Sequence, residues 1–252
     1  METITGTGNP LVKRLKALTD AKGRKQAGAF LVEGAVMINE ALSSGLTPIE
    51  ALSETENATV SALINAGALV RLCAKNVLES ACDTKTPQGI CASFRLPENN
   101  FIAPSARRLL ALDGVQDPGN MGTILRTADA AGFEGAYLSG ICADVFSPKV
   151  QRAAMGSGFR IPAPRVNLPE TLARLKVKGF KIVVSALDGL PLYENDVSGE
   201  EKLVLVIGNE AKGVSGEVQA LADIKLKIPM RGRAESLNAA VAAGILMYEM
   251  TK

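Results

Sequence analysis

The chain has 252 residues, of which 47% are hydrophobic and 21% are charged, and its formal net charge is +2. This composition predicts a globular protein with enough residues for one large core or two smaller ones. Histidine is absent, which excludes the commonest general base and the commonest metal ligand. Any chemistry must therefore depend on Arg, Glu, Ser, Asn, Lys or backbone groups.

The sequence favours a cytoplasmic protein without a metal site. No apolar run approaches the roughly 20 residues of a membrane span, and the N-terminus lacks the basic flank and continuous apolar core of a signal peptide. The four cysteines show no CxxC pairing; they are Cys73, Cys82, Cys91 and Cys142. We therefore expect reduced thiols, and the cysteine and carboxylate spacing does not suggest bound zinc.

Residues 1–96 alternate between helix and strand signals, as in a small α/β domain. Asn9 and Pro10 begin an amphipathic helix that leads into a basic turn. The expected strands are 30–32, 49–52, 68–72 and 89–94, and the further expected helices are 35–42, 59–66 and 75–80. Residues 97–105 contain two prolines and little periodicity, which predicts a linker to a second domain over 106–252.

The first helix and its exit carry a cluster of six basic residues: Lys13, Arg14, Lys16, Lys22, Arg24 and Lys25. Such a cluster suits contact with phosphates. The alternative interpretation is a solvated helix face.

Strands and helices also alternate along the second half of the chain, which predicts a mostly parallel sheet with helices on both faces. The expected strands are 108–115, 180–186, 203–207 and 224–228, and the expected helices are 121–131, 149–155, 169–178 and one from Leu237. Leu187–Gly189 is expected to form the exit corner of its strand. Gly156–Gly158 is expected to form a tight turn rather than a phosphate-binding loop.

Two strand-to-helix corners place polar residues where an α/β sheet usually opens its ligand crevice. The first is the glycine-punctuated loop 208–215, which carries Glu210, and the second is the loop 229–236. The last helix then has a face of small and apolar residues at helical spacing: Leu237, Ala240, Val241, Gly244, Ile245 and Tyr248. Ser236 is a good N-cap for that helix.

Asn120 and Arg126 lie six residues apart near the start of an earlier helix. Free amides at a helix N-terminus together with a guanidinium suit a phosphate. In the alternative interpretation, Asn120 only caps the helix and Arg126 pairs with Asp129.

Three motifs resemble those of the SpoU/TrmH family, RNA ribose 2′-O-methyltransferases of the SPOUT superfamily that use S-adenosyl-L-methionine. They are the Asn120 and Arg126 pair, Gly208–Glu210, and the long run Ile228–Asn238. One departure is Ala211, which stands where a glycine is common. The segments Asn9–Lys13 and Phe30–Gly34 resemble the L30e-like substrate-binding domain that precedes the catalytic domain in several of these enzymes.

The resemblance implies a deep trefoil knot in the second domain and a homodimer with active sites near the interface. It assigns polar roles at the reacting group to Asn120, Arg126, Glu210, Ser236 and Asn238. It implies cofactor contacts at Gly208, Ile228, Leu237, Ala186, Leu187 and Met230. For RNA contact we expect Lys13, Arg14, Lys16, Arg24 and Lys25.

A guanidinium is a poor base at neutral pH, so Arg126 is expected to orient the 2′-hydroxyl and lower its pKa, with Glu210 anchoring Arg126 or the substrate. Three further cations flank the loops and either contact phosphate or are solvated: Lys212, Arg231 and Arg233.

The expected function is methyl transfer from S-adenosylmethionine to a ribose 2′-hydroxyl of structured RNA, with ribosomal RNA favoured. Two alternatives stay open. One is an RNA-binding protein of the same fold without activity, and the other is a tRNA or base methyltransferase. A dinucleotide-dependent oxidoreductase is disfavoured, because no GxGxxG follows the first strand of a βαβ unit.

Overall fold

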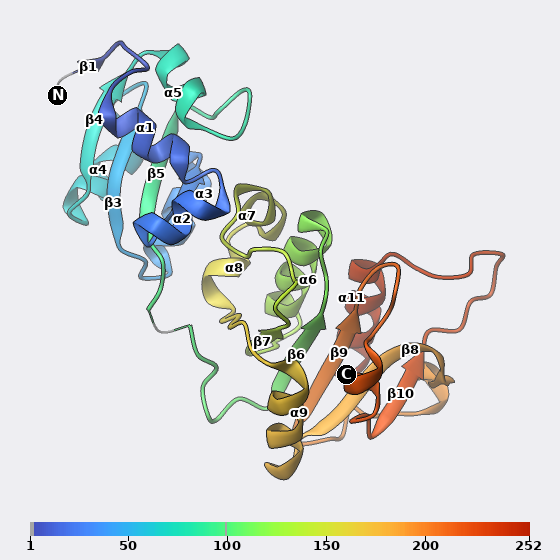
Figure 1. The fold of residues 1–252 in the computed structure, drawn as a ribbon. Coiled ribbons are helices and arrows are strands. Elements are labelled where there is room, and N and C mark those ends of the chain that lie inside the picture. The colour runs from blue at the N-terminus through green and yellow to red at the C-terminus, as the bar shows by residue number, and fades with distance from the viewer. Residues whose placement is uncertain (1–2, 99) are drawn as a thin grey trace. The chain divides into compact units, whose positions relative to one another are not determined.

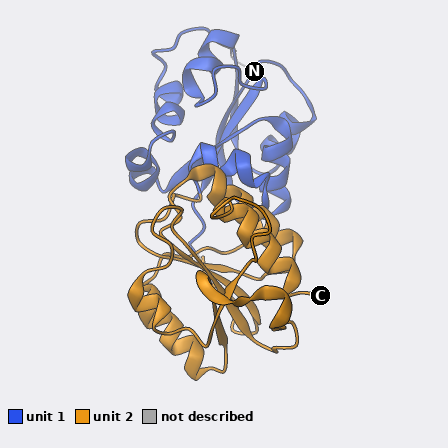
Figure 2. Cartoon of the chain, turned by 90° about the vertical axis from the view of Figure 1, so that its right-hand side faces the viewer, with its two compact units in different colours: residues 1–99, 146–159 blue, residues 100–145, 160–252 orange. Residues whose placement is uncertain are grey.

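The structure, a computed structural model, describes residues 3–98 and 100–252. The chain forms two compact units, residues 1–99 with 146–159 and residues 100–145 with 160–252 (Figure 2). Met1 and Glu2 of the expected first domain, and Asn99 of the expected linker, lie outside the described residues. Among the described helices, none has the length and apolar character needed to cross a bilayer.

The first unit contains a mixed sheet of order β1-β4-β3-β5-β2. Its described strands are β1 (Thr3–Ile4), β2 (Ala29–Glu33), β3 (Pro48–Ser53), β4 (Leu69–Cys73) and β5 (Ile90–Arg95). Five of its helices are α1 (Pro10–Ala17), α2 (Ala21–Ala27), α3 (Ala35–Ser43), α4 (Ala58–Asn65) and α5 (Lys75–Ala81). Strand β5 runs antiparallel to β2 and β3, while the other pairs are parallel. The alternating α/β pattern expected for this half is confirmed.

Helix α2 replaces the basic turn expected after the first helix. Its N-cap is Asp20, whose carboxylate accepts a hydrogen bond from the Gly23 amide at 2.8 Å. It ends at Gly28, which has φ of 58°, a left-handed conformation that glycine adopts without strain.

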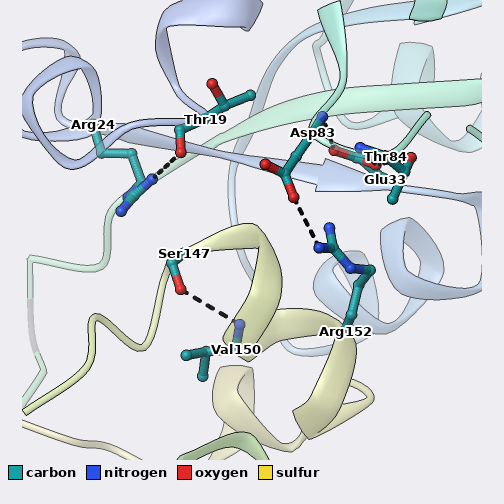
Figure 3. A network of polar contacts seen from close by, with 8 residues as sticks. All are labelled: Thr19, Arg24, Glu33, Asp83, Thr84, Ser147, Val150 and Arg152. Carbon is teal, nitrogen blue, oxygen red and sulfur yellow. Dashed lines mark hydrogen bonds and ion pairs between the residues drawn. The ribbon is translucent and has the colours of Figure 1, made fainter. Parts of the chain in front are cut away.

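The segment 146–159 belongs to the first unit, although the sequence assigned it to the second domain. It holds α7 (Pro148–Ala154) and the start of α8 (Ser157–Arg160). Phe146 and Phe159 pack on Phe30 with ring centroids 4.8 and 6.0 Å away. Arg152 forms an ion pair with Asp83 at 2.8 Å, beside the contacts between Glu33 and Thr84 (Figure 3).

The expected tight turn at Gly156–Gly158 is only partly correct. Met155 and Gly156 do turn the chain, with φ of 48° and 90°. Ser157 then begins α8 directly.

The second unit contains a sheet of order β10-β8-β9-β6-β7, in which all described pairs are parallel (Figure 1). Its strands are β6 (Arg108–Asp113), β7 (Ala136–Leu138), β8 (Lys181–Pro191), β9 (Leu203–Gly208) and β10 (Ile224–Lys227). Helices of this unit are α6 (Pro118–Ala130), α9 (Leu168–Val177), η1 (Leu192–Glu194), α10 (Gly216–Gln219) and α11 (Ala239–Glu249). This arrangement confirms the parallel α/β sheet expected from the sequence.

Alternate residues of the buried strands face opposite layers of helices. Leu109 and Ala111 of β6 share an apolar cluster with Leu172 of α9. The intervening Leu110 and Leu112 are also fully buried, and they point to the face where α6 and α11 pack together. Helices therefore cover both faces of the sheet. The trefoil knot implied by the family resemblance stays a prediction.

Strand β8 continues past the exit corner expected at Leu187–Gly189 and ends at Pro191. Its register with β10 shifts between Lys225 and Leu226. A Cβ on Gly189 would lie 2.7 Å from the Lys225 carbonyl. Glycine therefore lets the two backbones approach closely where a turn was expected.

Candidate active site

A cleft of about 470 Å³ opens at the carboxyl ends of β9 and β10 and beside residues 185–188 within β8. This is the usual place for a ligand in a parallel α/β sheet. Its lining includes every residue for which a cofactor contact was expected: Ala186, Leu187, Gly208, Ile228, Met230 and Leu237. The sheet thus gathers three chain segments around one cleft with both polar and apolar walls, and the cofactor contacts themselves stay predictions.

The loop after β9 is folded so tightly that only glycine fits at its start. A Cβ on Gly208 would lie 2.2 Å from the carbonyl carbon of Gly213 and 2.3 Å from the Val214 nitrogen. Backbone hydrogen bonds of 2.9 Å run in both directions between Asn209 and Gly213. The backbone of the loop is therefore held in place at the edge of the cleft.

Asn209 fixes this loop, a role that the sequence analysis did not assign. Its side-chain oxygen accepts hydrogen bonds from the amides of Ala211 and Lys212, each at 3.0 Å. Its side-chain nitrogen donates to the Gly114 carbonyl at 2.8 Å, which ties the loop to the end of β6. The available sequence signal was an asparagine beginning a glycine-closed loop, a typical Asx turn.

Three motif residues meet in one hydrogen-bonded network. The Asn120 side-chain nitrogen donates to Glu210 Oε1 at 3.0 Å, and the Asn238 side-chain nitrogen donates to Asn120 Oδ1 at 2.8 Å. Glu210 and Asn238 also line the cleft. Residues 118 positions apart are therefore joined beside the cleft.

Asp117, and not Asn120, caps α6, so the side chain of Asn120 is available for this network. The N-cap of α6 is Asp117, whose carboxylate accepts from the Asn120 backbone amide at 2.7 Å. The alternative interpretation of Asn120 as only a cap is therefore wrong. The N-cap of α11 is Asn238 and not Ser236, because Asn238 Oδ1 accepts from the amides of Ala240 and Val241.

Glu210 is held in its ionised form. Burial raises the pKa of its carboxyl, but hydrogen bonds from the Asn120 side chain and from backbone amides lower it by more. The net pKa lies below the ordinary value of 4.5. A carboxylate with this environment can accept hydrogen bonds or pair with a cation throughout the neutral range.

Changing Asn120 to aspartate tests the network, because it replaces the donor that faces Glu210 with a second carboxylate. Like charges in contact raise the pKa of one carboxyl, so we expect the acid limb of the pH–activity profile to move up by about one unit. Turnover at neutral pH should fall roughly 10- to 100-fold. Single-turnover methyl transfer from pH 4 to 9 measures both. An unchanged profile contradicts the assigned contact, and Asn65→Asp, at an exposed position of the first unit, is the control.

The stability of the fold at acidic pH should also change in Asn120→Asp. A carboxyl whose folded pKa is lowered contributes stability above its unfolded pKa, and this contribution is lost as the pH falls through the folded pKa. The contribution from Glu210 should therefore shrink in Asn120→Asp. Acid unfolding followed by circular dichroism would then begin at a higher pH than in the wild type.

Arg126 does not join the cleft within one chain. It is exposed on α6, and it is not among the residues that line the cleft. Asp129, its expected partner in the alternative interpretation, instead pairs with Arg160 at 2.7 Å. That alternative pairing is therefore wrong, and the guanidinium of Arg126 faces solvent in the single chain.

The segment from Arg231 to Asn238 is exposed and connects β10 to α11 (Figure 1). Ser236 and Lys212 both line the cleft. Arg231 and Arg233 are solvated in the single chain, and their contact with phosphate stays open.

Arg165 positions the loop that packs beside Gly114. Its guanidinium donates to four backbone carbonyls, those of Ser139, Gly140, Cys142 and Ala143, at 2.7 to 3.2 Å. The hydroxyl of Ser139 in turn accepts from the Gly114 amide at 2.9 Å. The loop 139–143 and the Asn209 loop thus contact the same glycine at the end of β6.

Arg165→Lys should loosen this loop, because an ammonium cannot span two pairs of carbonyls as the planar guanidinium does. We expect the free energy of unfolding to fall by about 1–2 kcal/mol, as urea denaturation would measure. Arg174→Lys is the matched control, since Arg174 makes an exposed pair with Glu170 and one long hydrogen bond to the Thr171 hydroxyl at 3.3 Å, both within α9. Equal stability of the two variants would contradict the role of Arg165.

The basic cluster of the first unit divides into two kinds of residue. Lys13, Lys16 and Lys25 are exposed. Arg14 pairs with Glu50 at 2.5 Å, a contact that raises the pKa of the guanidinium. Arg24 is only 4% exposed, which does not fit its expected contact with RNA.

Arg24 has a structural role. Its guanidinium donates to the carbonyl of Leu18 at 2.9 Å, just beyond the end of α1. It also donates to the carbonyl of Thr19 at 3.1 Å (Figure 3). A buried cation needs such partners. A side chain held in this way is not available to phosphate, and we remove Arg24 from the RNA-contacting group.

The parallel sheet, the cleft at its carboxyl edge and the amide–carboxylate network define an α/β enzyme domain that binds a small cofactor. Sequence comparison identifies the family. A profile of the SpoU rRNA Methylase family matches residues 107–248, and a profile of the MRM3-like substrate binding domain matches residues 9–92. The chain belongs to the SpoU rRNA methylase family.

Relatives along the full length support this assignment. The chain is 39% identical over 251 residues to the 23S rRNA (guanosine(2553)-2′-O)-methyltransferase RlmP of Bacillus subtilis, covering 99% of both chains. The AdoMet-bound rRNA methyltransferase of Sinorhizobium meliloti has a TM-score of 0.90 at 34% identity, with coverage of 99% and 97%. AviRb of Streptomyces viridochromogenes, solved with AdoMet, has a TM-score of 0.84 at 29% identity, with coverage of 96% and 97%.

Proposed function

We propose that this protein transfers a methyl group from S-adenosylmethionine to a ribose 2′-hydroxyl of ribosomal RNA. The observation that carries the proposal is the meeting of Asn120, Glu210 and Asn238 beside the cleft bounded by Gly208. The printed activity of the full-length B. subtilis relative supports rRNA as the substrate. An rRNA substrate would place the activity in the cytoplasm.

The residues of the cleft fit the proposed cofactor. A volume of about 470 Å³ is within the usual range for sites that bind molecules of this size. Apolar side chains such as Leu187, Ile228 and Leu237 suit the flat faces of an adenine, while the backbone of the Gly208 loop offers amides and carbonyls at close range. S-adenosylmethionine, when bound, supplies an electrophilic methyl group.

The polar residues would prepare the hydroxyl. A ribose 2′-hydroxyl is a weak nucleophile that must be held in line and must lose its proton. Glu210 is ionised and fixed by Asn120, so it can anchor a cation or orient the sugar. Arg126 would supply positive charge near the hydroxyl and lower its pKa, since a guanidinium does not itself act as a base.

We also infer that two copies of the chain associate through α11 and complete each other's sites. Val241 and Tyr248 of α11, from the expected face of small and apolar residues, are exposed in the single chain by 51% and 56%, and Leu237 just before the helix is also exposed. Adjacent apolar side chains on one helix favour a protein–protein contact. Arg126 lies on α6, the helix that packs on α11. This association would therefore bring its guanidinium to the active site of the other copy.

Methylation of separated RNA pools tests the proposed activity. The protein would be incubated with S-adenosylmethionine labelled in the methyl group and with 23S rRNA, 16S rRNA or tRNA. After alkaline hydrolysis, we expect label in an alkali-resistant dinucleotide from 23S rRNA, because a 2′-O-methyl blocks cleavage of the following phosphodiester. Label in mononucleotides would indicate base methylation, and label in tRNA alone would overturn the rRNA assignment.

A further inference from the structure

A second cavity lies on the first unit, in the corner between α1, α2 and the strands β3 and β5. Its volume is about 430 Å³. Its walls are mostly apolar and include Leu15, Leu18, Ala27, Ala29 and Ile49. Arg14, Glu50 and Ser93 add polar groups to the lining.

The helical wall of the pocket is fixed by specific contacts. Gly23 is required there, because a Cβ would lie 1.8 Å from the carbonyl oxygen of Ala17 at the end of α1. The buried guanidinium of Arg24 holds the chain between the two helices through the carbonyl of Leu18 and that of Thr19 (Figure 3). The corner is therefore preformed, which favours binding because little ordering is needed.

The strand wall contains a β-bulge. The register between β3 and β5 shifts between Pro48 and Glu50, which leaves Ile49 without a partner on β5. The hydroxyl of Ser93 is within hydrogen-bond distance of both the Glu50 amide and the Glu50 carbonyl, at 3.2 and 3.3 Å. Bulges often redirect side chains next to binding sites, and Ile49 and Glu50 both line this pocket.

The polar lining can recognise both donors and acceptors. Arg14 contacts Glu50 through two nitrogens, at 2.5 and 3.1 Å, so the ion pair is bidentate and oriented. Each carboxylate oxygen keeps further acceptor capacity, and the guanidinium keeps further N–H donors. A flat ligand with an amino group beside a ring acceptor would match this pair.

The surface of the two helices is cationic. Lys13 and Lys16 are exposed on α1, and Lys22 and Lys25 are exposed on α2. A pocket with apolar walls flanked by ammonium groups matches an unpaired nucleotide, whose base has apolar faces and whose phosphates are anionic. A peptide ligand would use the apolar walls but would leave the lysines without partners.

We propose that this pocket binds one unpaired, amino-bearing nucleobase of the RNA substrate, with the Arg14–Glu50 pair at the edge of the base and the lysines on the flanking phosphates. The inference rests on the proposed function only in taking RNA as the substrate. The pocket is distinct from the cleft of the second unit and would contribute to the choice of RNA.

Filling the pocket without changing charge tests this. Ala27→Phe places an aromatic ring into the pocket from the exposed end of α2, and Ala66→Phe, at the exposed end of α4, is the matched control. Filter binding to B. subtilis 23S rRNA transcript would be measured at several salt concentrations. We expect Ala27→Phe to weaken binding roughly tenfold with an unchanged salt slope.

Lys25→Ala should instead reduce the slope of the logarithm of affinity against the logarithm of salt concentration by about one, because it removes a phosphate contact. Equal affinities of Ala27→Phe and Ala66→Phe would overturn the proposal, and so would a changed salt slope for Ala27→Phe. Methyl transfer at saturating RNA separates the two proposals, since the pocket predicts a higher KM and an unchanged kcat for Ala27→Phe. Absence of any transfer by the wild type would count against the proposed function and not against the pocket.

Discussion

Gly208→Val is expected to abolish binding of S-adenosylmethionine, because the new side chain would occupy the space that the Gly213 backbone fills 2.2 Å from the Cβ position. The loop would have to move, and it forms one wall of the cleft. Overpacking of this kind also destabilises a protein, typically by about 1–3 kcal/mol. Isothermal calorimetry with S-adenosylmethionine and with its demethylated product would measure the loss of binding.

The control for this prediction must separate loss of the cleft from loss of the fold. A Cβ on Gly199 meets nothing within 4 Å, so Gly199→Val should bind the cofactor like the wild type. Gly208→Ala is the milder variant if Gly208→Val fails to fold. Wild-type affinity in a folded Gly208→Ala protein would show that the loop does not form part of the cofactor site.

Arg126→Ala should lower methyl transfer by about 10²–10³-fold, the usual effect of removing a group that stabilises charge at the reacting atom. Affinity for S-adenosylmethionine should stay unchanged, because Arg126 does not line the cleft. Its exposed position on α6 also predicts little change in the free energy of unfolding. Calorimetry, urea denaturation and single-turnover kinetics on 23S rRNA measure the three quantities.

Mixing variants tests whether Arg126 acts across two copies. Glu210→Gln removes the carboxylate charge from the cleft, and Arg126→Ala removes the guanidinium. A mixed dimer contains one site with an intact cleft and an intact Arg126 from the other chain, so we expect activity to recover when the two inactive proteins are exchanged. No recovery, despite sedimentation evidence for mixed dimers, would place Arg126 and Glu210 in the same chain's site.

Hydrophobic runs were sufficient to predict most of the sheet. The strands β6 and β9 are buried on both faces, which produces the uninterrupted apolar runs 109–112 and 203–207. The polar motif residues were found by resemblance, and the structure connects Asn120, Glu210 and Asn238 directly. The expected strand end at Leu187–Gly189 was wrong, because a glycine there serves close pairing with β10 and not a turn.

The helix caps and the role of Arg24 depend on tertiary contacts, which the sequence alone does not reveal. Asp117 and Asn120 are both good caps by residue type, and the partner of Asn120 lies 90 positions away at Glu210. Arg24 belongs to a run of cations in sequence. Only the fold of the α1–α2 corner turns its side chain inward to two carbonyls while Lys25 beside it stays in water.

The aromatic contacts of Phe30 have a consequence for biosynthesis. Its neighbours Phe146 and Phe159 come from the segment 146–159, which completes the first unit. A nascent chain that has released only the first hundred residues from the ribosome would leave this aromatic surface open to water. We therefore expect the first unit to mature late during translation, and an N-terminal fragment cut at the linker to be aggregation-prone unless residues 146–159 are grafted onto it.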